Sequence, residues 1–389
     1  MNNNICYAEQ LNSLSVFRGI LKDNVVKKLL ILLTEKTIAA YGDFVHELYN
    51  YTDNLTEYLL NAVLEDENNY MLRLATMQEI PDVVNKAAHN ELCLLQNISR
   101  ITPDTVKKLA GIDLELAEWN VSELNFIKIY AERMSQLQTK GYGIFAKYHA
   151  FVLKDGVIAP VKAPDNQKLS QLEGYENERR KVIDNTLALL SGKPAANALL
   201  YGDAGTGKSS TVKAVANEYK DMGLRLIELK KSQLHELPAV IESIAKNPLK
   251  FIIFIDDLSF SYDDNDFGAL KAVLEGSVTS KTPNLVIYAT SNRRHLVKEK
   301  FSDRDGDDIH ANDSREELTS LSERFGLKVT FVKPDKTLYI QIVTSLAKQY
   351  GIECNEALFQ KAEMYALRRN GRSGRAARQF IESVKAGLI

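Results

Sequence analysis

Two adjacent aspartates at the end of an apolar run are the first residues that indicate chemistry. Residues 251–257 read FIIFIDD. The run predicts a buried strand, and carboxylates at the end of a buried strand are unfavourable unless a positive group or hydrogen bonds compensate them. Asp256 and Asp257 therefore predict a site for a positively charged partner. A pair of helix-capping aspartates is the structural alternative.

A glycine-rich motif upstream supplies a reason for such a site. Residues 199–210 read LLYGDAGTGKSS, which fits G-x-x-x-x-G-K-[ST] between a predicted strand and a predicted helix. Glycines let backbone N–H groups approach phosphate oxygens, and the helix N-terminus adds a favourable dipole. A glycine-rich turn with a solvated lysine is the alternative. The predicted phosphate-binding residues are Gly202, Asp203, Ala204, Gly205, Thr206, Gly207, Lys208, Ser209 and Ser210.

The two patterns complete each other as a site for ATP and Mg²⁺. Lys208 would contact the β- and γ-phosphates, and Ser209 would ligate Mg²⁺. Asp256 would hold the same ion, either directly or through water. Asp257 would then lie next to the γ-phosphate, where it could orient the attacking water.

These residues need a sheet to position them. From residue 195 onward, strands are expected at 196–201, 225–230, 251–256, 285–290 and 327–332, separated by helices such as 208–220 and 267–275. Alternation of this kind predicts an α/β fold with a parallel five-stranded sheet that helices cover on both faces. The helical pattern continues from residue 335 to the end.

The first 140 residues have a different character, with three glycines, two prolines and apolar residues at helical spacing. The segment TPDTVKKLA predicts a helix start, with Thr102 as cap and Pro103 in the first turn. Asp155-Gly156 in FVLKDGVIAPV predicts a hairpin. The expected domains are therefore a helical domain (1–140), a hairpin and connecting segment (141–194), an α/β core (195–334) and a helical lid (335–389).

Composition excludes some classes of protein. The chain has 389 residues and a net charge of −2, which gives no global attraction to nucleic acid or to an anionic membrane. No apolar run approaches the roughly 20 residues that span a bilayer, and no signal peptide is recognisable at the N-terminus. Three isolated cysteines fit a reducing compartment. We therefore expect a cytoplasmic protein with no membrane partner.

At this point the chain resembles a known class. The phosphate loop, FIIFIDD, IYATSNRRHL, LSERFGL and GRSGRAARQF occur in the order found in AAA+ ATPases. Five shorter segments are similar in sequence to those of one bacterial AAA+ family, whose members are known only as ATP-binding proteins of unknown function. These segments are DDLSF, SNRRHL, FSDRDGDDIH, SERFGL and SGRAARQF. This resemblance covers about residues 150–389. It implies a AAA+ P-loop core with a helical lid, an oligomer and ATP hydrolysis.

The resemblance also implies roles for individual residues. Asn292 matches the first sensor, a polar group near the γ-phosphate, and Arg324 matches an arginine finger that acts on a neighbouring subunit's nucleotide. Arg375 matches the second sensor, with Arg378 as the substitute. The structural alternatives are a turn asparagine for Asn292, a surface salt bridge for Arg324 and a solvated basic face for the lid arginines.

One departure from the AAA+ pattern affects the expected activity. AAA+ motors more often have Asp-Glu where this chain has Asp256-Asp257. The shorter second acid indicates a slow switch rather than a fast motor and leaves the turnover rate open.

Another feature is the highly charged stretch 298–316. It does not fit the EF-hand template for a calcium site, and we expect it to be a loop at a subunit interface.

Three functions remain open on the sequence. The first is an oligomeric ATPase that remodels or loads a macromolecular partner, with the N-terminal domain binding an unknown protein. The second is an ATP-dependent scaffold with little or no hydrolysis, and the third is a P-loop kinase for a small molecule. The kinase is disfavoured because it needs neither an interface arginine nor a helical lid. A nucleic-acid partner is a further alternative, through the lid arginines Arg368, Arg369, Arg372, Arg375 and Arg378.

Overall fold

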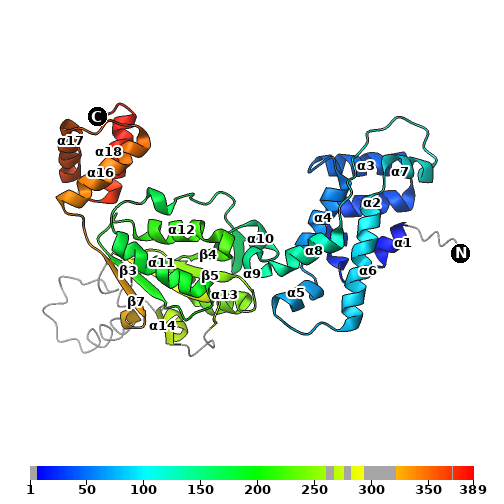
Figure 1. Cartoon of the computed structure of the whole chain (residues 1–389), viewed down its shortest axis with the longest axis horizontal. Coiled ribbons are helices and arrows are strands. Elements are labelled where there is room, and N and C mark those ends of the chain that lie inside the picture. The colour runs from blue at the N-terminus through cyan, green and yellow to red at the C-terminus, as the bar shows by residue number, and fades with distance from the viewer. Residues whose placement is uncertain (1–6, 260–266, 276–281, 293–320, 370) are drawn as a thin grey trace. The chain divides into compact units, whose positions relative to one another are not determined.

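The computed structural model describes residues 7–259, 267–275, 282–292, 321–369 and 371–389. The chain divides into two compact units, Met1–Lys147 and Tyr148–Ile389 (Figure 1). Large apolar side chains are buried in both units. The second unit contains the phosphate loop and the two aspartates.

The first unit is helical in the part that the structure describes. Six of its helices are capped at the N-terminus by a side chain that accepts a backbone N–H bond. One of these side chains is that of Thr102, which precedes α7, and Pro103 is the first residue of that helix, as predicted. The elements are α1 (Tyr7–Asn12), η1 (Arg18–Lys22), α2 (Asn24–Glu35), α3 (Ile38–Tyr49), α4 (Leu55–Glu65), α5 (Asn69–Ala75), α6 (Asp82–Ser99), α7 (Pro103–Ala110), α8 (Phe126–Ser135), α9 (Leu137–Lys140) and α10 (Ile144–Lys147).

The second unit is built on one sheet with the strand order β2-β1-β4-β5-β6-β3-β7. The predicted parallel strands are all present. Their neighbours pair in parallel, from β4 through β7. The strands are β1 (Ala150–Lys154), β2 (Val157–Pro160), β3 (Ala198–Gly202), β4 (Leu224–Leu229), β5 (Lys250–Ile255), β6 (Leu285–Ser291) and β7 (Leu327–Phe331).

The sheet is larger than the five strands expected from the sequence. Asp155 and Gly156 both have positive φ, as a tight hairpin turn requires, and β1 pairs antiparallel with β2. In addition, β1 pairs in parallel with β4, so that Phe151 is opposite Ile227. The hairpin therefore extends the sheet to seven strands and covers the edge of β4, which would otherwise leave backbone groups unpaired.

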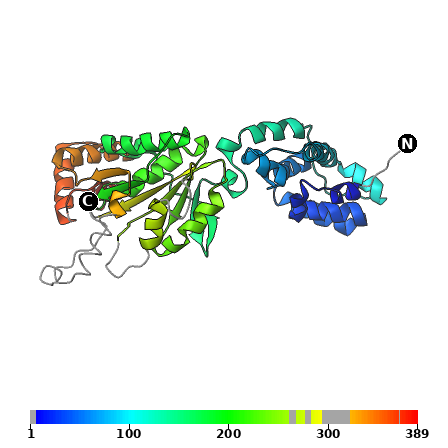
Figure 2. The same ribbon diagram turned by 90° about the horizontal axis from the view of Figure 1, so that it is seen from below.

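Helices cover both faces of this sheet. Figure 2 shows α11 (Glu176–Leu190) and α12 (Lys208–Glu218) on one face, and α13 (Leu237–Ile244) and α14 (Phe267–Glu275) on the other. Strand β5 is buried from Phe251 to Ile255, as expected for a central strand covered on both sides. Short 3-10 turns complete this region, namely η2 (Leu169–Gln171), η3 (Lys220–Met222) and η4 (Lys231–Glu236).

The C-terminal lid consists of three helices, α16 (Lys336–Tyr350), α17 (Glu356–Arg368) and α18 (Gly374–Lys385). Asp335, Asn355 and Ser373 cap them by accepting backbone N–H bonds. Figure 1 shows them as a small helical group after β7. No helix in the described part of the chain is long and apolar enough to cross a membrane.

Candidate nucleotide-binding site

The phosphate loop joins the end of β3 to the start of α12. Gly202 has φ of 132°, and a Cβ atom there would lie only 2.1 Å from the carbonyl oxygen of Phe331. Gly207 has φ of 94° and immediately precedes α12. Both positions therefore require glycine, because L-amino acids with side chains rarely adopt these conformations. The loop directs the N-terminus of α12 into the cavity described below.

Lys208 is held at the centre of the site with an exposed fraction of 6%. Its Nζ donates to the carbonyl oxygens of Gly202 and Asp203, at 2.9 and 2.7 Å, and to Asn292 Oδ1 at 3.0 Å. Burial lowers the pKa of this ammonium group to about 8, and nearby carboxylates, led by Asp203, oppose the change. Lys208 is therefore positioned for phosphate, and its charge is sensitive to alkaline pH.

This low pKa predicts pH-dependent binding of ATP. The free folded protein loses the Lys208 proton above pH 8, whereas bound phosphates favour the charged form, so that binding takes up a proton. The terminal phosphate titrates near a pKa of about 6 and contributes little in this range. We expect affinity for Mg-ATP to fall by up to about tenfold per pH unit between about pH 8 and 10.

Calorimetric titrations from pH 7 to pH 10 would measure this dependence. Lys208→Arg is the matched control, because a guanidinium group keeps its charge throughout this range. The control should show a flat profile if it binds ATP. A flat profile for the unmodified protein would contradict the assignment.

The two aspartates lie beside the start of α12. Ser209 Oγ donates to Asp256 Oδ1 at 2.6 Å, and Asn292 Nδ2 donates to Asp257 Oδ1 at 2.8 Å. Asn292 thus connects Lys208 to Asp257 through the two ends of one amide. A hydroxyl and a carboxylate side by side are hard oxygen donors, which Mg²⁺ prefers. Ser209 and Asp256 therefore fit the predicted magnesium site.

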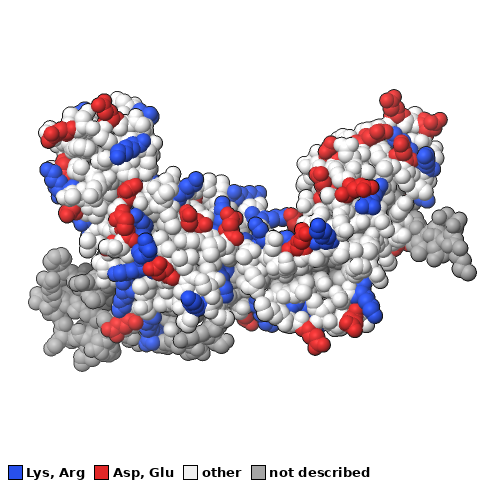
Figure 3. Space-filling model, in the orientation of Figure 1, with Lys and Arg blue, Asp and Glu red and all other residues white. Residues whose placement is uncertain are grey.

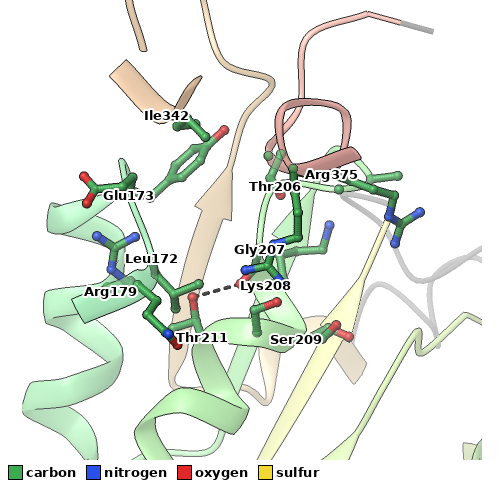
Figure 4. Close-up of a pocket in the computed structure, with 18 of the residues that line it drawn as sticks. Leu172, Glu173, Arg179, Thr206, Gly207, Lys208, Ser209, Thr211, Ile342 and Arg375 are labelled. Atoms are coloured by element: carbon green, nitrogen blue, oxygen red, sulfur yellow. Dashed lines mark hydrogen bonds between the residues drawn. The ribbon is translucent and has the colours of Figure 1, made fainter. Parts of the chain in front are cut away.

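These residues surround a cavity of ≈ 480 Å³. Figure 4 shows Lys208 and Ser209 of α12 and Arg375 of α18 around it, with Leu172, Glu173, Arg179 and Ile342 also lining it. Of the predicted residues, those lining the cavity are Ala204, Gly205, Thr206, Gly207, Lys208, Ser209, Ser210, Asp256, Asp257, Asn292 and Arg375. Gly202, Asp203 and Arg324 are not among the residues that line it.

Asp203 points instead to the connection between sheet and lid. Its N–H donates to the carbonyl oxygen of Phe331 at 3.0 Å, and its Oδ2 accepts from the N–H of Lys333 at 2.7 Å. The connection is also held by Tyr175, whose hydroxyl donates to the carbonyl oxygen of Val332 at 2.7 Å. A carboxylate facing the phosphates would be repelled, so this orientation is the favourable one.

The lid arginines occupy different positions. The backbone N–H of Arg375 donates to the carbonyl oxygen of Gly205 at 3.2 Å, which places this residue against the phosphate loop. Arg378 also lines the cavity, but its guanidinium donates to Gln167 Oε1 at 3.2 Å. Of the two arginines, only Arg375 bonds to the phosphate loop in the described part of the chain.

Arg324 lies at the opposite end of the sheet from its own phosphate loop. It precedes β7 by three residues, and the parallel register places Leu327 opposite Ala198 but Phe331 opposite Gly202. Four strand residues span about 13 Å at roughly 3.3 Å each. This placement separates Arg324 from the site of its own chain. Buried Leu321 and Phe325 flank it along the chain. The charged stretch 298–316 lies outside the described residues.

Several lining residues were not predicted from the sequence. Thr290 bonds to Asp256, and the other unpredicted residues come from η2 and the segment after it and from α11, α12, α16 and α18: Gln171, Leu172, Glu173, Tyr175, Arg179, Thr211, Ile342, Leu346 and Gly374. Apart from Gly374, which lies in GRSGRAARQF, no motif marks these residues, although Thr290 could have been noticed as a polar residue in an otherwise apolar predicted strand. Their apolar members suit a flat nucleobase better than phosphate.

The sheet and the site together define the class of protein. A parallel core with a phosphate loop after β3, two aspartates after β5, an asparagine after β6 and a lid arginine is the arrangement of a AAA+ P-loop nucleotide-binding protein. The resemblance noted in the sequence is confirmed. Within this class, residues 146–388 match the family described as "Protein of unknown function (DUF815)", and the chain belongs to that family.

Similarity to curated proteins is confined to a shorter segment. The replication factor C large subunit of Staphylothermus marinus is 33% identical over 117 residues, which are 28% of this chain and 27% of that protein. The same subunit of Sulfolobus acidocaldarius is 32% identical over 126 residues, or 30% of this chain and 28% of that protein. The chain thus matches less than a third of the length of these relatives.

Solved structures with a similar chain path include the Thermotoga maritima RuvB Holliday junction branch migration motor. It is 16% identical, with a TM-score of 0.39, over 57% of this chain and 65% of that one. The FIGL-1 AAA domain in complex with ADP is 19% identical, with a TM-score of 0.41, over 57% of this chain and 73% of that one.

Proposed function

We propose that the protein binds Mg-ATP in this cavity and hydrolyses it slowly, as an oligomeric switch or remodelling or loading factor for a macromolecular partner. The observation that carries the proposal is the convergence of Lys208, Ser209, both aspartates and Arg375 on one cavity. A phosphate loop alone would be consistent with many nucleotide-binding proteins. The added acids and the lid arginine supply what hydrolysis and its sensing require.

The roles of the residues follow from their contacts. Lys208 would donate to the phosphates from its buried position. Ser209 and Asp256 would hold Mg²⁺, which when bound neutralises charge on the phosphate oxygens. Asp257 would accept a hydrogen bond from the attacking water and orient it toward the γ-phosphate. Asn292 is bonded to both Lys208 and Asp257 and would hold the ammonium and carboxylate groups in fixed positions relative to each other.

A scaffold with little hydrolysis is the second candidate, and one contact favours it. Asp257 has a short side chain, and its Oδ1 already accepts the bond from Asn292 at 2.8 Å. This bond restrains the short side chain, and water would then have to be bound mainly by Oδ2. A P-loop kinase is disfavoured because it would not need the C-terminal helical lid, which contributes Ile342, Leu346 and Arg375 to the cavity lining.

The proposed partner is a protein bound by the N-terminal helical unit, with oligomer formation through the AAA+ unit. Nucleic acid is less favoured because the five lid arginines do not act as one group. Arg375 and Arg378 line the cavity, while Arg372 forms an ion pair with Glu363 at 2.7 Å. On the face drawn in Figure 3, acidic and basic side chains are interspersed over the lid.

Separate replacement of the two aspartates tests the proposal. Asp256→Asn should weaken Mg-ATP binding by about tenfold or more, because an amide is a poorer ligand for Mg²⁺ than a carboxylate. It should leave ATP binding in chelator unchanged. Asp257→Asn should retain binding but abolish phosphate release, because only the water-orienting group is lost. Calorimetry and a phosphate-release assay measure the two effects.

Asp184→Asn is the matched control, because this exposed aspartate on α11 is not among the residues lining the cavity. If both site variants hydrolyse ATP at the unmodified rate, neither role can stand. If the unmodified protein binds Mg-ATP but releases no phosphate, the scaffold function replaces the switch.

A further inference from the structure

Strand β5 stops pairing in a regular ladder just before the two aspartates. Its last residue, Ile255, is opposite Ala289 on β6. The next residue of β6 is Thr290, which is 1% exposed and lines the nucleotide cavity. From this point on, bonds to Thr290 connect β6 to the segment that carries the aspartates.

Thr290 makes three hydrogen bonds to three consecutive residues. Its hydroxyl donates to Asp256 Oδ1 at 2.5 Å and accepts from the N–H of Asp257 at 3.0 Å. Its carbonyl oxygen accepts from the N–H of Leu258 at 2.7 Å. One buried hydroxyl therefore bonds to both acids, to the side chain of one and to the backbone of the other.

The backbone of Asp257 explains why such a contact is needed. Asp257 has φ of 53°, a left-handed conformation that is uncommon for residues other than glycine and is maintained only when neighbouring groups fix it. The bond from Asp257 N–H to Thr290 lies directly at this strained residue. Threonine suits the position, since its β-branched side chain has few rotamers and holds the hydroxyl in one direction.

The carboxylate of Asp256 is oriented by two hydroxyls at the same oxygen. Ser209 donates to Oδ1 from the start of α12, and Thr290 donates to Oδ1 from β6. Charge-assisted bonds of this kind are strong and directional. Removal of either donor would allow the carboxylate to rotate away from the proposed magnesium site.

We propose that Thr290 is a positioning residue that sets the Mg²⁺-binding carboxylate of Asp256 and the water-orienting carboxylate of Asp257 with a single hydroxyl. This inference rests on the proposed Mg-ATP function. The two aspartates then act as one unit, because the same side chain fixes both. Loss of the hydroxyl should impair both magnesium-dependent binding and hydrolysis.

Thr290→Val tests the inference, because valine has nearly the same shape but no hydroxyl. ATP binding in chelator should change by less than about twofold, since phosphate contacts remain with Lys208 and the loop. The gain in affinity on adding Mg²⁺ should fall by about tenfold, as expected for loss of a bond to a charged group. Single-turnover hydrolysis should slow by about a hundredfold, because the water-orienting acid is displaced as well.

Two further variants separate positioning from simple stability. Thr290→Ser restores the hydroxyl and should lie within about threefold of the unmodified protein in both measurements. Thr186→Val removes another buried threonine hydroxyl, one that bonds Val182 and Tyr288 away from the cavity. It should lower the unfolding temperature without changing the magnesium-dependent affinity or the hydrolysis rate.

Calorimetry with ATP in chelator and in Mg²⁺, with a single-turnover assay on the same samples, decides the question. Unchanged magnesium dependence and rate in Thr290→Val would overturn the inference, even if the variant unfolds at a lower temperature. If that variant does not fold, Thr290→Ala makes the same test with a smaller side chain. Failure of the proposed function is distinguishable, since the unmodified protein itself would then bind no Mg-ATP.

Discussion

Arg324→Ala is expected to lose ATP hydrolysis by about 10³- to 10⁵-fold, the range that arginine fingers contribute in GTPases. It should keep its affinity for Mg-ATP, because Arg324 does not line the cavity of its own chain. Because Arg324 precedes β7 at the far end of the strand from Gly202, we expect any contact it makes with nucleotide to be with that of a neighbouring subunit. The measurement is phosphate release, with nucleotide affinity determined in parallel.

Mixing two inactive variants tests the shared site directly. Lys208→Ala lacks phosphate binding but retains Arg324, whereas Arg324→Ala retains its phosphate loop. Mixed oligomers should therefore recover part of the phosphate release. Arg180→Ala is the control for loss of a basic side chain, because this residue is exposed on α11 and is not among the cavity residues. It should remain active.

Light scattering should show the mass of the protein rising with Mg-ATP, and specific activity should rise with protein concentration. Absence of recovery, in a mixture shown to contain mixed oligomers, would mean that Arg324 has only a structural role. A protein that stays monomeric at saturating ATP would exclude the shared site altogether.

The phosphate loop and its strand–helix context could be predicted because the information is local. Gly202, Gly207 and Lys208 lie within seven residues, and the structure places them in the expected turn between β3 and α12. The signal for the two aspartates is equally local, because they directly follow the apolar run of a buried strand. Parallel strands then bring Asp256 and Asn292 to the same edge of the sheet without any further information.

Other features depend on contacts between distant segments. The hairpin at Asp155-Gly156 was visible from its turn residues, but its pairing with β4 is a contact between distant segments that no local pattern specifies. Thr290 is a polar residue in an apolar predicted strand, but only the pairing of β5 with β6 places it beside the aspartates. The orientation of the Asp203 side chain toward the N–H of Lys333 likewise depends on where β7 ends.

Lys208→Ala is expected to have the second large effect, a loss of Mg-ATP binding. Removing the ammonium should weaken Mg-ATP affinity by at least about a hundredfold, because a charge-assisted phosphate contact is lost in a pocket built around it. The same change also leaves Asn292 Oδ1 and two carbonyl oxygens without their shared donor. Lys213→Ala is the matched control, since Lys213 lies on the same helix and pairs with Glu228 at 3.2 Å.

Calorimetric titration of the unmodified protein and these two lysine variants with Mg-ATP is the most direct test of a nucleotide site in this cavity. We expect saturable binding, of similar affinity, for the unmodified protein and Lys213→Ala, with no detectable binding for Lys208→Ala. Equal affinity of Lys208→Ala and the unmodified protein, or no binding by the unmodified protein, would contradict this expectation.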